Sequence, residues 1–322
     1  MFLFSVAILV GLVVLVWSAD RFISGAAALA DNLGVSPMLI GLTVVGFGTS
    51  APEILVSTMA VINGNPGLSI GNAIGSNIAN IGLILGFTAL VIPLAVHSSV
   101  LRREYPLLLA VSVLTFLLMW DGDLNRFDGT ILLVTLMGVL GWMIYTAKTG
   151  AADPIAGEFE AEIPHNVPTK KALLLLSGGL LFLLVSSRLL VWGATNVAVA
   201  LGVSDVIIGL TIVAIGTSLP ELAASITSAL KGEDDLAIGN VIGSNLYNLL
   251  AVLSIPGLIA PGAYSPEVMN RDLPVMLALT LLLYFMGHGL GRQGRINRLE
   301  GLLLLLCFIG YQSLLFFSLV NA

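Results

Sequence analysis

The sequence predicts an all-α integral membrane protein with ten transmembrane helices, built as two inverted-topology repeats of five helices. Three observations lead to this prediction: an apolar composition, long apolar runs and an internal repeat. The 322-residue chain is 57% hydrophobic and only 10% charged, whereas soluble domains carry about 25% charged residues. Many apolar runs reach the roughly 18 residues that a membrane helix needs, and they lack the alternation of barrel strands.

Ten apolar segments can be drawn along the chain. They comprise residues 2–18 (extending as far as 30), 37–62, 68–92, 104–120, 129–147, 172–194, 205–230, 236–260, 273–290 and 299–320. The longest polar gap holds four acidic residues and three prolines. We therefore expect a five-helix unit at 1–147, a linker at 148–171 and a second unit at 172–322. The first segment has no basic leader, so we interpret it as a spanning helix and not as a signal peptide.

Basic residues gather in alternate gaps, which predicts the orientation by the positive-inside rule. With both termini outside, ten basic residues fall on the inner side: Arg21, Arg102, Arg103, Lys148, Lys170, Lys171, Lys231, Arg292, Arg295 and Arg298. Three fall on the outer side: Arg126, Arg188 and Arg271. We therefore predict a multi-pass protein of the cell (inner) membrane, with both termini outside and the linker in the cytoplasm.

The internal repeat has an offset of 168 residues. Residues 33–82 align without a gap on 201–250, and 25 of these 50 positions are identical. Each half has five predicted helices, an odd number, so the second copy must enter the membrane from the opposite side. Inverted repeats are common in secondary transporters, which bind their substrates near the bilayer midplane where the repeats meet. The two copies, at about 37–92 and 205–260, are therefore where we expect the site.

Glu53 and Glu221 are the strongest site candidates. Of 19 acidic residues, they alone lie deep inside predicted spans, and they occupy equivalent repeat positions. An ionisable group at the bilayer centre costs at least about 2.5–3.5 kcal/mol on insertion scales. One interpretation is a protonated glutamate that bonds a neighbouring helix. The interpretation that we favour is a cation site formed by two facing carboxylates.

The flanking residues fit a cation site. Each glutamate ends the motif Gly-Thr-Ser-x-Pro-Glu, at 48–53 and 216–221. Proline prevents the helical hydrogen bond to the carbonyl four residues earlier, which is that of Gly48 or Gly216. Thr49, Ser50, Thr217 and Ser218 add hydroxyl oxygens. Such an all-oxygen set suits hard cations such as Ca²⁺ and Na⁺.

A second motif, Gly-Ser-Asn-x-x-Asn, follows at 75–80 and 243–248. It places Ser76 and Asn80, and likewise Ser244 and Asn248, four residues apart on one helix face. We expect these four side chains to bind cations as well. Glycines spaced by four residues precede them and favour close helix packing. Of Asn72, Asn77, Asn240 and Asn245, we expect some to bond the backbone exposed at the helix breaks.

Two carboxylates give the predicted site a charge of −2, which one Ca²⁺ or several Na⁺ could balance. Exchange by alternating access would then need helix movement and no covalent chemistry. Proton-coupled divalent-cation exchange, a cation channel and an intramembrane metalloenzyme are the alternatives. The enzyme is the weakest, because no nucleophile or base accompanies the glutamates.

Other functions lack their sequence context. The pattern G-x-G-x-x-A at 46–51 lies inside an apolar helix with no preceding strand, which argues against nucleotide binding. The single cysteine, Cys307, excludes an internal disulfide. We expect no cofactor, nucleic acid, nucleotide or obligate protein partner. The expected partners are the transported ions and the lipid bilayer.

These paired motifs resemble the α-repeats of the cation/calcium exchanger superfamily, in particular its prokaryotic sodium/calcium exchanger branch. The resemblance implies ten helices, four midplane cation sites and exchange of three Na⁺ for one Ca²⁺. It implies as ligands Thr49, Ser50, Glu53, Ser76, Asn80, Thr217, Ser218, Glu221, Ser244 and Asn248, with the carbonyls of Gly46 and Ala214. Potassium-dependent relatives carry Asp at the position of Asn248, so the neutral residue argues against potassium dependence. The Gly-Asn-Ala-x-Glu pattern usual in the proton/calcium branch is absent, although the two glutamates leave proton coupling open.

Overall fold

The protein is a bundle of helices, seen here in a computed structural model that describes residues 1–36, 39–149, 154–288 and 294–320. The elements, with π-helical segments written η, are α1 (Phe2–Asn32), η1 (Ile40–Val45), α3 (Gly46–Thr49), α4 (Ala51–Ile62), α5 (Pro66–Ala79), η2 (Asn80–Leu85), α6 (Gly86–Val91), β1 (Leu94–Ala95), α7 (Ser99–Leu118), β2 (Asp123–Leu124), α8 (Arg126–Thr149), α9 (Pro154–Glu162), α10 (Thr169–Leu201), α11 (Asp205–Ile208), η3 (Gly209–Val213), α12 (Ala214–Thr217), α13 (Leu219–Lys231), α14 (Asp234–Tyr247), η4 (Asn248–Val252), α15 (Ser254–Ile259), β3 (Gly262–Ala263), η5 (Val268–Asp272), α16 (Leu273–His288), β4 (Arg295–Ile296) and α17 (Arg298–Val320).

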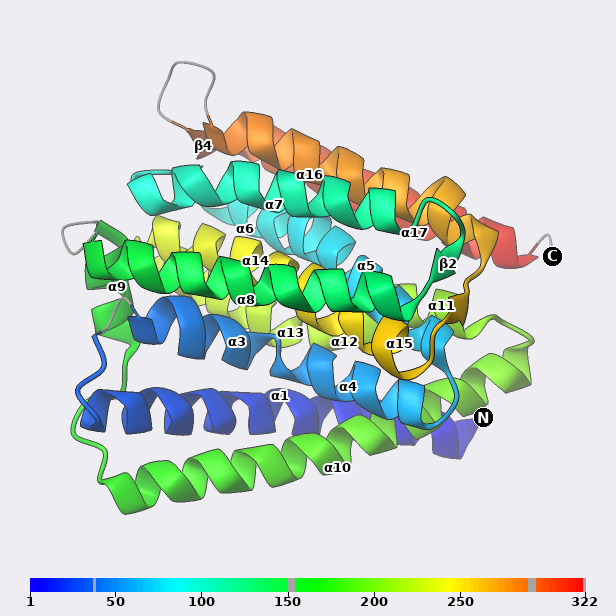
Figure 1. Ribbon diagram of the computed structural model, residues 1–322, viewed down its shortest axis with the longest axis horizontal. Coiled ribbons are helices and arrows are strands. Elements are labelled where there is room, and N and C mark those ends of the chain that lie inside the picture. Colours follow the sequence, from blue (N-terminus) through cyan, green and yellow to red (C-terminus); the bar gives the residue numbers. More distant parts are fainter. Residues whose placement is uncertain (37–38, 150–153, 289–293, 321–322) are drawn as a thin grey trace.

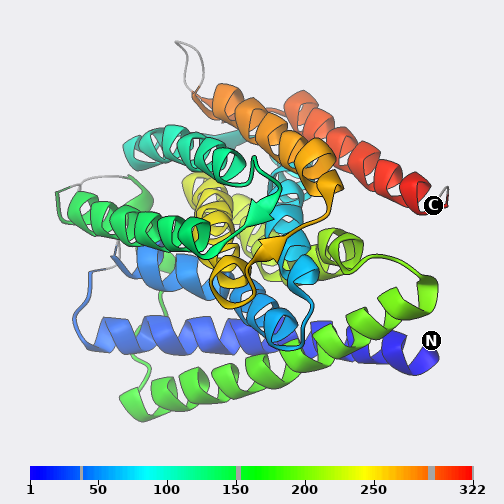
Figure 2. The same cartoon turned by 45° about the vertical axis from the view of Figure 1, so that its right-hand side comes forward.

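The helices that carry the motifs lie in the middle of the bundle. The long helices α1 and α10 run side by side along one edge, and α16 and α17 lie along the opposite edge (Figures 1 and 2). The short strands only join loops: β1 pairs with β4 and β2 with β3, both antiparallel. The largest hydrophobic core joins α5 and α14 to α7, α8, α16 and α17. The motif helices are therefore enclosed by protein on most sides.

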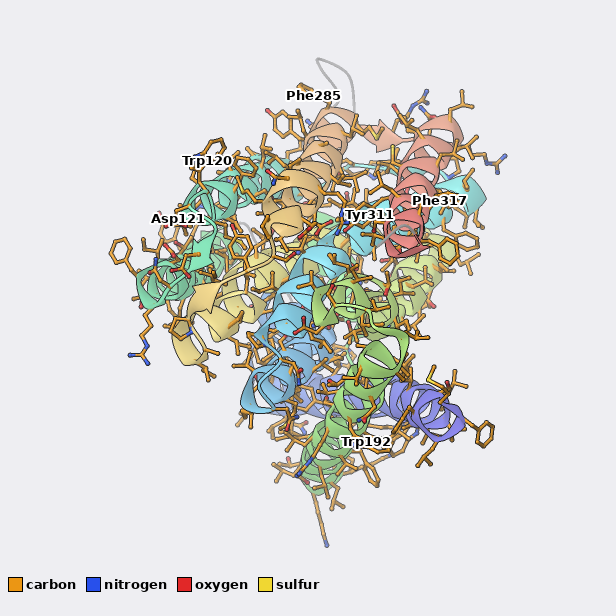
Figure 3. All side chains as sticks on the ribbon, turned by 90° about the vertical axis from the view of Figure 1, so that its right-hand side faces the viewer. Trp120, Asp121, Trp192, Phe285, Tyr311 and Phe317 are labelled. Atoms are coloured by element: carbon orange, nitrogen blue, oxygen red, sulfur yellow. The ribbon has the colours of Figure 1, made fainter. Side chains whose placement is uncertain are left out.

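Bulky apolar side chains cover the outside of the bundle, as a lipid-facing surface requires. Figure 3 shows Trp120 and Phe317 at the periphery, whereas Tyr311 points inward between α16 and α17. The exposed fractions agree, at 66% for Trp120, 62% for Phe317 and 4% for Tyr311. The outward face of the bundle is thus apolar, and its polar side chains are concentrated inside.

Length and composition identify seven described helices that could each cross a membrane, or eight if the bent pair 205–217 and 219–231 is one span. The predicted count of ten is not confirmed by this criterion. Helix α7 has the length of a span, but Arg102, Arg103 and Glu104 lie near its start. The predicted span 37–62 is divided at Ser50, like its bent counterpart, and begins in residues outside the described part of the chain.

The structure adds two details to the sequence prediction. The predicted linker contains a helix, α9. Arg21 lies within α1 and not in a gap, because this helix is longer than its apolar run. Arg188 lies within α10, inside the predicted segment 172–194. Both side chains lie on exposed positions of these helices.

Candidate cation site

Two helix breaks at equivalent positions create the candidate site. Ser50 and Ser218 separate α3 from α4 and α12 from α13, with nearly identical backbone angles of φ −84°, ψ 0° and φ −83°, ψ 5°. Pro52 and Pro220 stand in the first turn after each break, where a missing N–H costs no hydrogen bond. The second break bends the helix by 41°. The proline motif therefore produces a break, as predicted, and starts a new helix immediately before each glutamate.

Glu53 and Glu221 lie in the first turns of α4 and α13, and both are fully buried. They are close enough for their charges to interact. Oε1 of Glu221 accepts a hydrogen bond from the Ser244 hydroxyl at 3.2 Å. Both oxygens of Glu53 and Oε2 of Glu221 have no hydrogen-bond partner among the described residues. The two carboxylates thus keep three acceptor oxygens open inside the protein.

Three other buried carboxylates each accept a hydrogen bond from a nearby protein group. Asp128 accepts a hydrogen bond from the backbone N–H of Asn125, and Asp235 accepts one from that of His97. Asp272 pairs with Arg271 and accepts the hydroxyl of Tyr311 at 2.8 Å. Burying a polar group without a partner costs about 1–3 kcal/mol. The open oxygens of Glu53 therefore need a separate explanation, which a bound cation would supply.

The second motif of each repeat meets the first motif of the other repeat. The hydroxyls of Thr49 and Ser244 lie 3.2 Å apart, and those of Thr217 and Ser76 lie 3.5 Å apart. The sequence alone could not show this crossing, because the paired positions are 195 and 141 residues apart. This crossing brings six predicted ligand residues together: Thr49, Glu53, Ser76, Thr217, Glu221 and Ser244.

Asn80 and Asn248 lie where α5 and α14 change into the π-helices η2 and η4. Asn80 donates from Nδ2 to the side-chain oxygen of Asn245 at 3.0 Å, which leaves its own Oδ1 open. Asn248 is buried, and neither its oxygen nor its nitrogen has a hydrogen-bond partner in the described part of the chain. A π-helix shifts the backbone register and is frequent at functional sites.

The remaining predicted oxygens are placed nearby. The hydroxyls of Ser50 and Ser218 are buried and have no partner among the described residues. The carbonyls of Gly46 and Ala214 accept the hydroxyls of Thr49 and Thr217 at 3.2 and 3.4 Å. The described residues contain no cluster of three or more His, Cys, Asp and Glu side chains. The donor set is therefore two carboxylates with hydroxyl, amide and carbonyl oxygens, which fits Ca²⁺ and Na⁺.

Asn72 and Asn240 support the breaks, as the sequence suggested for some of these asparagines. Each donates from Nδ2 to a glutamate carbonyl, that of Glu53 at 3.3 Å and that of Glu221 at 3.4 Å. Asn77, in contrast, bonds the carbonyl of Ala73 within its own helix.

The two repeats pack unequally around this site. A β-carbon placed on Gly75 would lie only 2.8 Å from Leu210 Cα and from Ala214 Cβ, so α5 lies against the second broken helix. Gly243, the repeat counterpart of Gly75, has nothing within 4 Å of that position. The predicted close approach is therefore confirmed for Gly75, whereas α14 has open space beside Gly243.

A cavity of about 330 Å³ opens on the looser side. It is lined by Thr49, Pro220 and Asn240 near the site, and by Asp20 and Glu162 farther out. Phe159 of the linker helix α9 also lines it. The cavity therefore connects the candidate site with the side of the molecule on which the linker lies.

Comparison with known proteins agrees with this geometry. The family model described as sodium/calcium exchanger protein matches residues 3–145 and 171–317. The chain belongs to the sodium/calcium exchanger family. Members of this family are transporters and not enzymes, so the chain is a membrane transport protein of the exchanger class.

Several relatives match along nearly the whole exchanger. Sodium/calcium exchanger MaX1 of Methanosarcina acetivorans is 32% identical over 345 residues, covering 96% of this chain and 97% of MaX1. CaxA of Alkalimonas amylolytica, provisionally assigned as an antiporter, is 52% identical over 98% of this chain and 99% of its own. The structure of the exchanger NCX_Mj soaked with 2.5 mM Na⁺ and 0.1 mM Ca²⁺ superposes with a TM-score of 0.68 at 33% identity, covering 97% of this chain and 98% of that one.

Proposed function

We propose that this exchanger moves Ca²⁺ across the membrane in exchange for Na⁺, and that the cations bind between Glu53 and Glu221. The supporting observation is the set of open oxygens on two fully buried carboxylates. The buried hydroxyls of Ser50 and Ser218 and the amide oxygens of Asn80 and Asn248 are open as well. One Ca²⁺ would neutralise the two carboxylates, and Na⁺ ions could replace it on the same oxygens.

The wider ligand set is part of this proposal. It consists of Thr49, Ser50, Glu53, Ser76, Asn80, Thr217, Ser218, Glu221, Ser244 and Asn248, with the carbonyls of Gly46 and Ala214. Glu53 and Glu221 supply the charge, and the other groups replace water around the ion. Because Ser244 already donates to Glu221, it would have to turn its hydroxyl proton away when a cation binds.

We propose ten spans in two inverted repeats, since the broken helices and α7 raise the composition-based count to ten. Both termini then face outward, and α9 lies in the cytoplasm. The tight contact of Gly75 lies on the half of the bundle near the loop before α11, which would be outer. The cavity near Asn240 and Glu162 would be inner. The structure then corresponds to an inward-facing state of an alternating-access cycle.

Radiolabelled Ca²⁺ uptake into proteoliposomes tests the proposal. Vesicles loaded with Na⁺ should take up Ca²⁺, whereas vesicles loaded with K⁺ or choline at the same pH should not. Empty liposomes give the background. Equal uptake under all three internal ions would contradict sodium coupling.

Proton-coupled exchange is the second candidate, because two buried carboxylates could also carry protons through the same site. The same assay separates the candidates when a pH gradient is imposed with no Na⁺ present. Uptake that follows this gradient and ignores Na⁺ would assign protons as the coupling ion and leave the cation site in place.

A further inference from the structure

The linker helix α9 packs into the bundle through one apolar face. Ile155 and Phe159 in α9 and Ile163 directly after it are spaced by four residues and are all buried, with exposed fractions of 0%, 6% and 4%. This spacing places them along one side of a helix. Glu158 lies beside them, and its Oε2 accepts the backbone N–H of Leu236 at 2.6 Å. That N–H belongs to the first turn of α14, where amide groups lack partners within the helix.

Phe159 and Ile155 reach two glycines on different helices. The ring of Phe159 covers Gly41 in η1 so closely that a β-carbon on Gly41 would overlap it. Ile155 Cδ1 lies 3.4 Å from the β-carbon position of Gly239 in α14. The same two side chains line a small void of about 30 Å³ between Gly41 and Gly239. Helix α9 therefore stands between the first broken helix and α14.

The repeat shows what this gap would contain if it were closed. Gly41 and Gly239 correspond to Gly209 and Gly71 at the offset of 168 residues. A β-carbon on Gly209 would overlap the carbonyl oxygen of Leu68 and lie 3.0 Å from Gly71 Cα. Around Gly209 and Gly71, backbone therefore packs directly on backbone, and this contact closes the route from the site to the outer surface. On the other side, the surface of Gly41 is covered by an aromatic ring.

We propose that α9 is a wedge that holds the inner path open and must withdraw from between Gly41 and Gly239 before that path can close. A backbone contact like that of Gly209 with Gly71 leaves no room for the Phe159 ring. The wedge therefore favours the inward-facing state and slows the step that returns the site to the outside. This inference rests on the alternating access of the proposed function.

Thiol labelling of two reporter positions tests the wedge without measuring transport. Ala223 lines the inner cavity, and Leu55 is its repeat counterpart on the opposite side of the site. Each is replaced singly, Ala223→Cys or Leu55→Cys, in a Cys307→Ala background, and labelled with N-ethylmaleimide in detergent. Removing the Phe159 ring frees the space between Gly41 and Gly239, so Phe159→Ala should slow labelling at position 223 and speed it at position 55, each by about threefold or more.

The matched control is Phe127→Ala, the same substitution at a position that is 71% exposed at the start of α8. It should change neither rate. General loosening of the protein by Phe159→Ala would speed labelling at both positions, and that result, or unchanged rates, would overturn the proposal. A failure of sodium-driven uptake would instead contradict the proposed function, because the labelling assay contains no ion gradient.

Discussion

Thr217 donates a hydrogen bond to the side-chain oxygen of Asn72 at 3.1 Å, and its repeat counterpart, Thr49, makes no such bond to Asn240. Asn72 also donates to Ser57 at 3.0 Å, whereas Ser225, the counterpart of Ser57, bonds the carbonyl of Ala237 instead. Asn72 is fully buried, and Asn240 lines the cavity. The bond from Thr217 to Asn72 therefore joins the two repeats on the tightly packed side, and its counterpart is missing on the open side.

This asymmetry predicts different costs for the same substitution. Asn72→Ala removes three hydrogen bonds and leaves the Thr217 and Ser57 hydroxyls without this partner, so it should lower the free energy of unfolding by about 1–3 kcal/mol. Asn240→Ala removes one long bond at a position that lines the cavity and should cost less than about 1 kcal/mol. Thermal unfolding of both purified variants in one detergent measures the difference. Equal losses would show that the asymmetry has no energetic consequence.

The two glutamates should be indispensable for transport. Glu53→Gln and Glu221→Gln each remove one of the two charges that would balance Ca²⁺, so each should abolish sodium-driven Ca²⁺ uptake. Neither should prevent membrane insertion, because the amide is easier to bury than the carboxylate. We also expect Ca²⁺ to raise the thermal stability of the wild-type protein, and this increase should be absent in both variants. Glu267→Gln, at an exposed position before η5, is the control; near-normal uptake in either site variant would rule out the proposed binding mode.

Asn248→Asp should change ion coupling, and Asn80→Asp should impair the fold. Asn248 has no hydrogen bond to lose among the described residues, so a carboxylate there adds a third negative charge near the cations. We expect a tighter apparent affinity for Ca²⁺ and an altered dependence of uptake on Na⁺. Asn80 donates to Asn245, and an aspartate would replace that bond with repulsion between oxygens. Uptake measured against Na⁺ concentration and pH checks the first effect; an unchanged profile for Asn248→Asp would place Asn248 away from the ions.

The docking of α9 should weaken as pH rises. Burial raises the pKa of Glu158 to about 7, helped by the charges of Asp235, Glu233 and Asp234 and opposed by its bond to Leu236. The docked helix thus favours the protonated carboxyl, and the stabilisation is present at low pH and lost as pH rises through about 7. A nitroxide on Gly157→Cys, an exposed position with open space around it, should become more mobile between pH 6 and pH 8.

Two Glu→Gln substitutions on the same helix provide the controls for this pH effect. Glu158→Gln keeps an oxygen that can accept the Leu236 N–H but cannot ionise, so label mobility should no longer depend on pH. Glu160→Gln removes an exposed carboxylate that pairs with His165, whose pKa is raised by its hydrogen bonds to Asp31 and Glu160. If Glu158 alone causes the pH effect, the wild-type dependence should persist in Glu160→Gln. Lys231 pairs with Glu162 at the end of α9 and is unchanged in both variants. A pH response that persists in Glu158→Gln would assign the effect to another group.

The membrane class, the internal repeat and the helix breaks could be predicted from the sequence alone. Pro52 and Pro220 cannot continue a helix in the ordinary way, and the acidic residues Glu53 and Glu221 inside apolar segments led us to predict a cation site. These features act over a few residues or through composition, so they can be read without coordinates. The same holds for the hydroxyls and amides of the second motif, whose spacing fixes their helix face.

Only the tertiary structure decided which groups meet across the repeats. The contact between Thr49 and Ser244 joins residues far apart in the chain, and no local pattern predicts it. The unequal state of the two repeats is also invisible in the sequence, because Gly75 and Gly243 share one motif yet only Gly75 is packed. Helix α9 lies outside the repeat, and its polar residues concealed the apolar face that reaches Gly41. Equivalent sequences permit both arrangements, and the packing of the whole chain selects one of them.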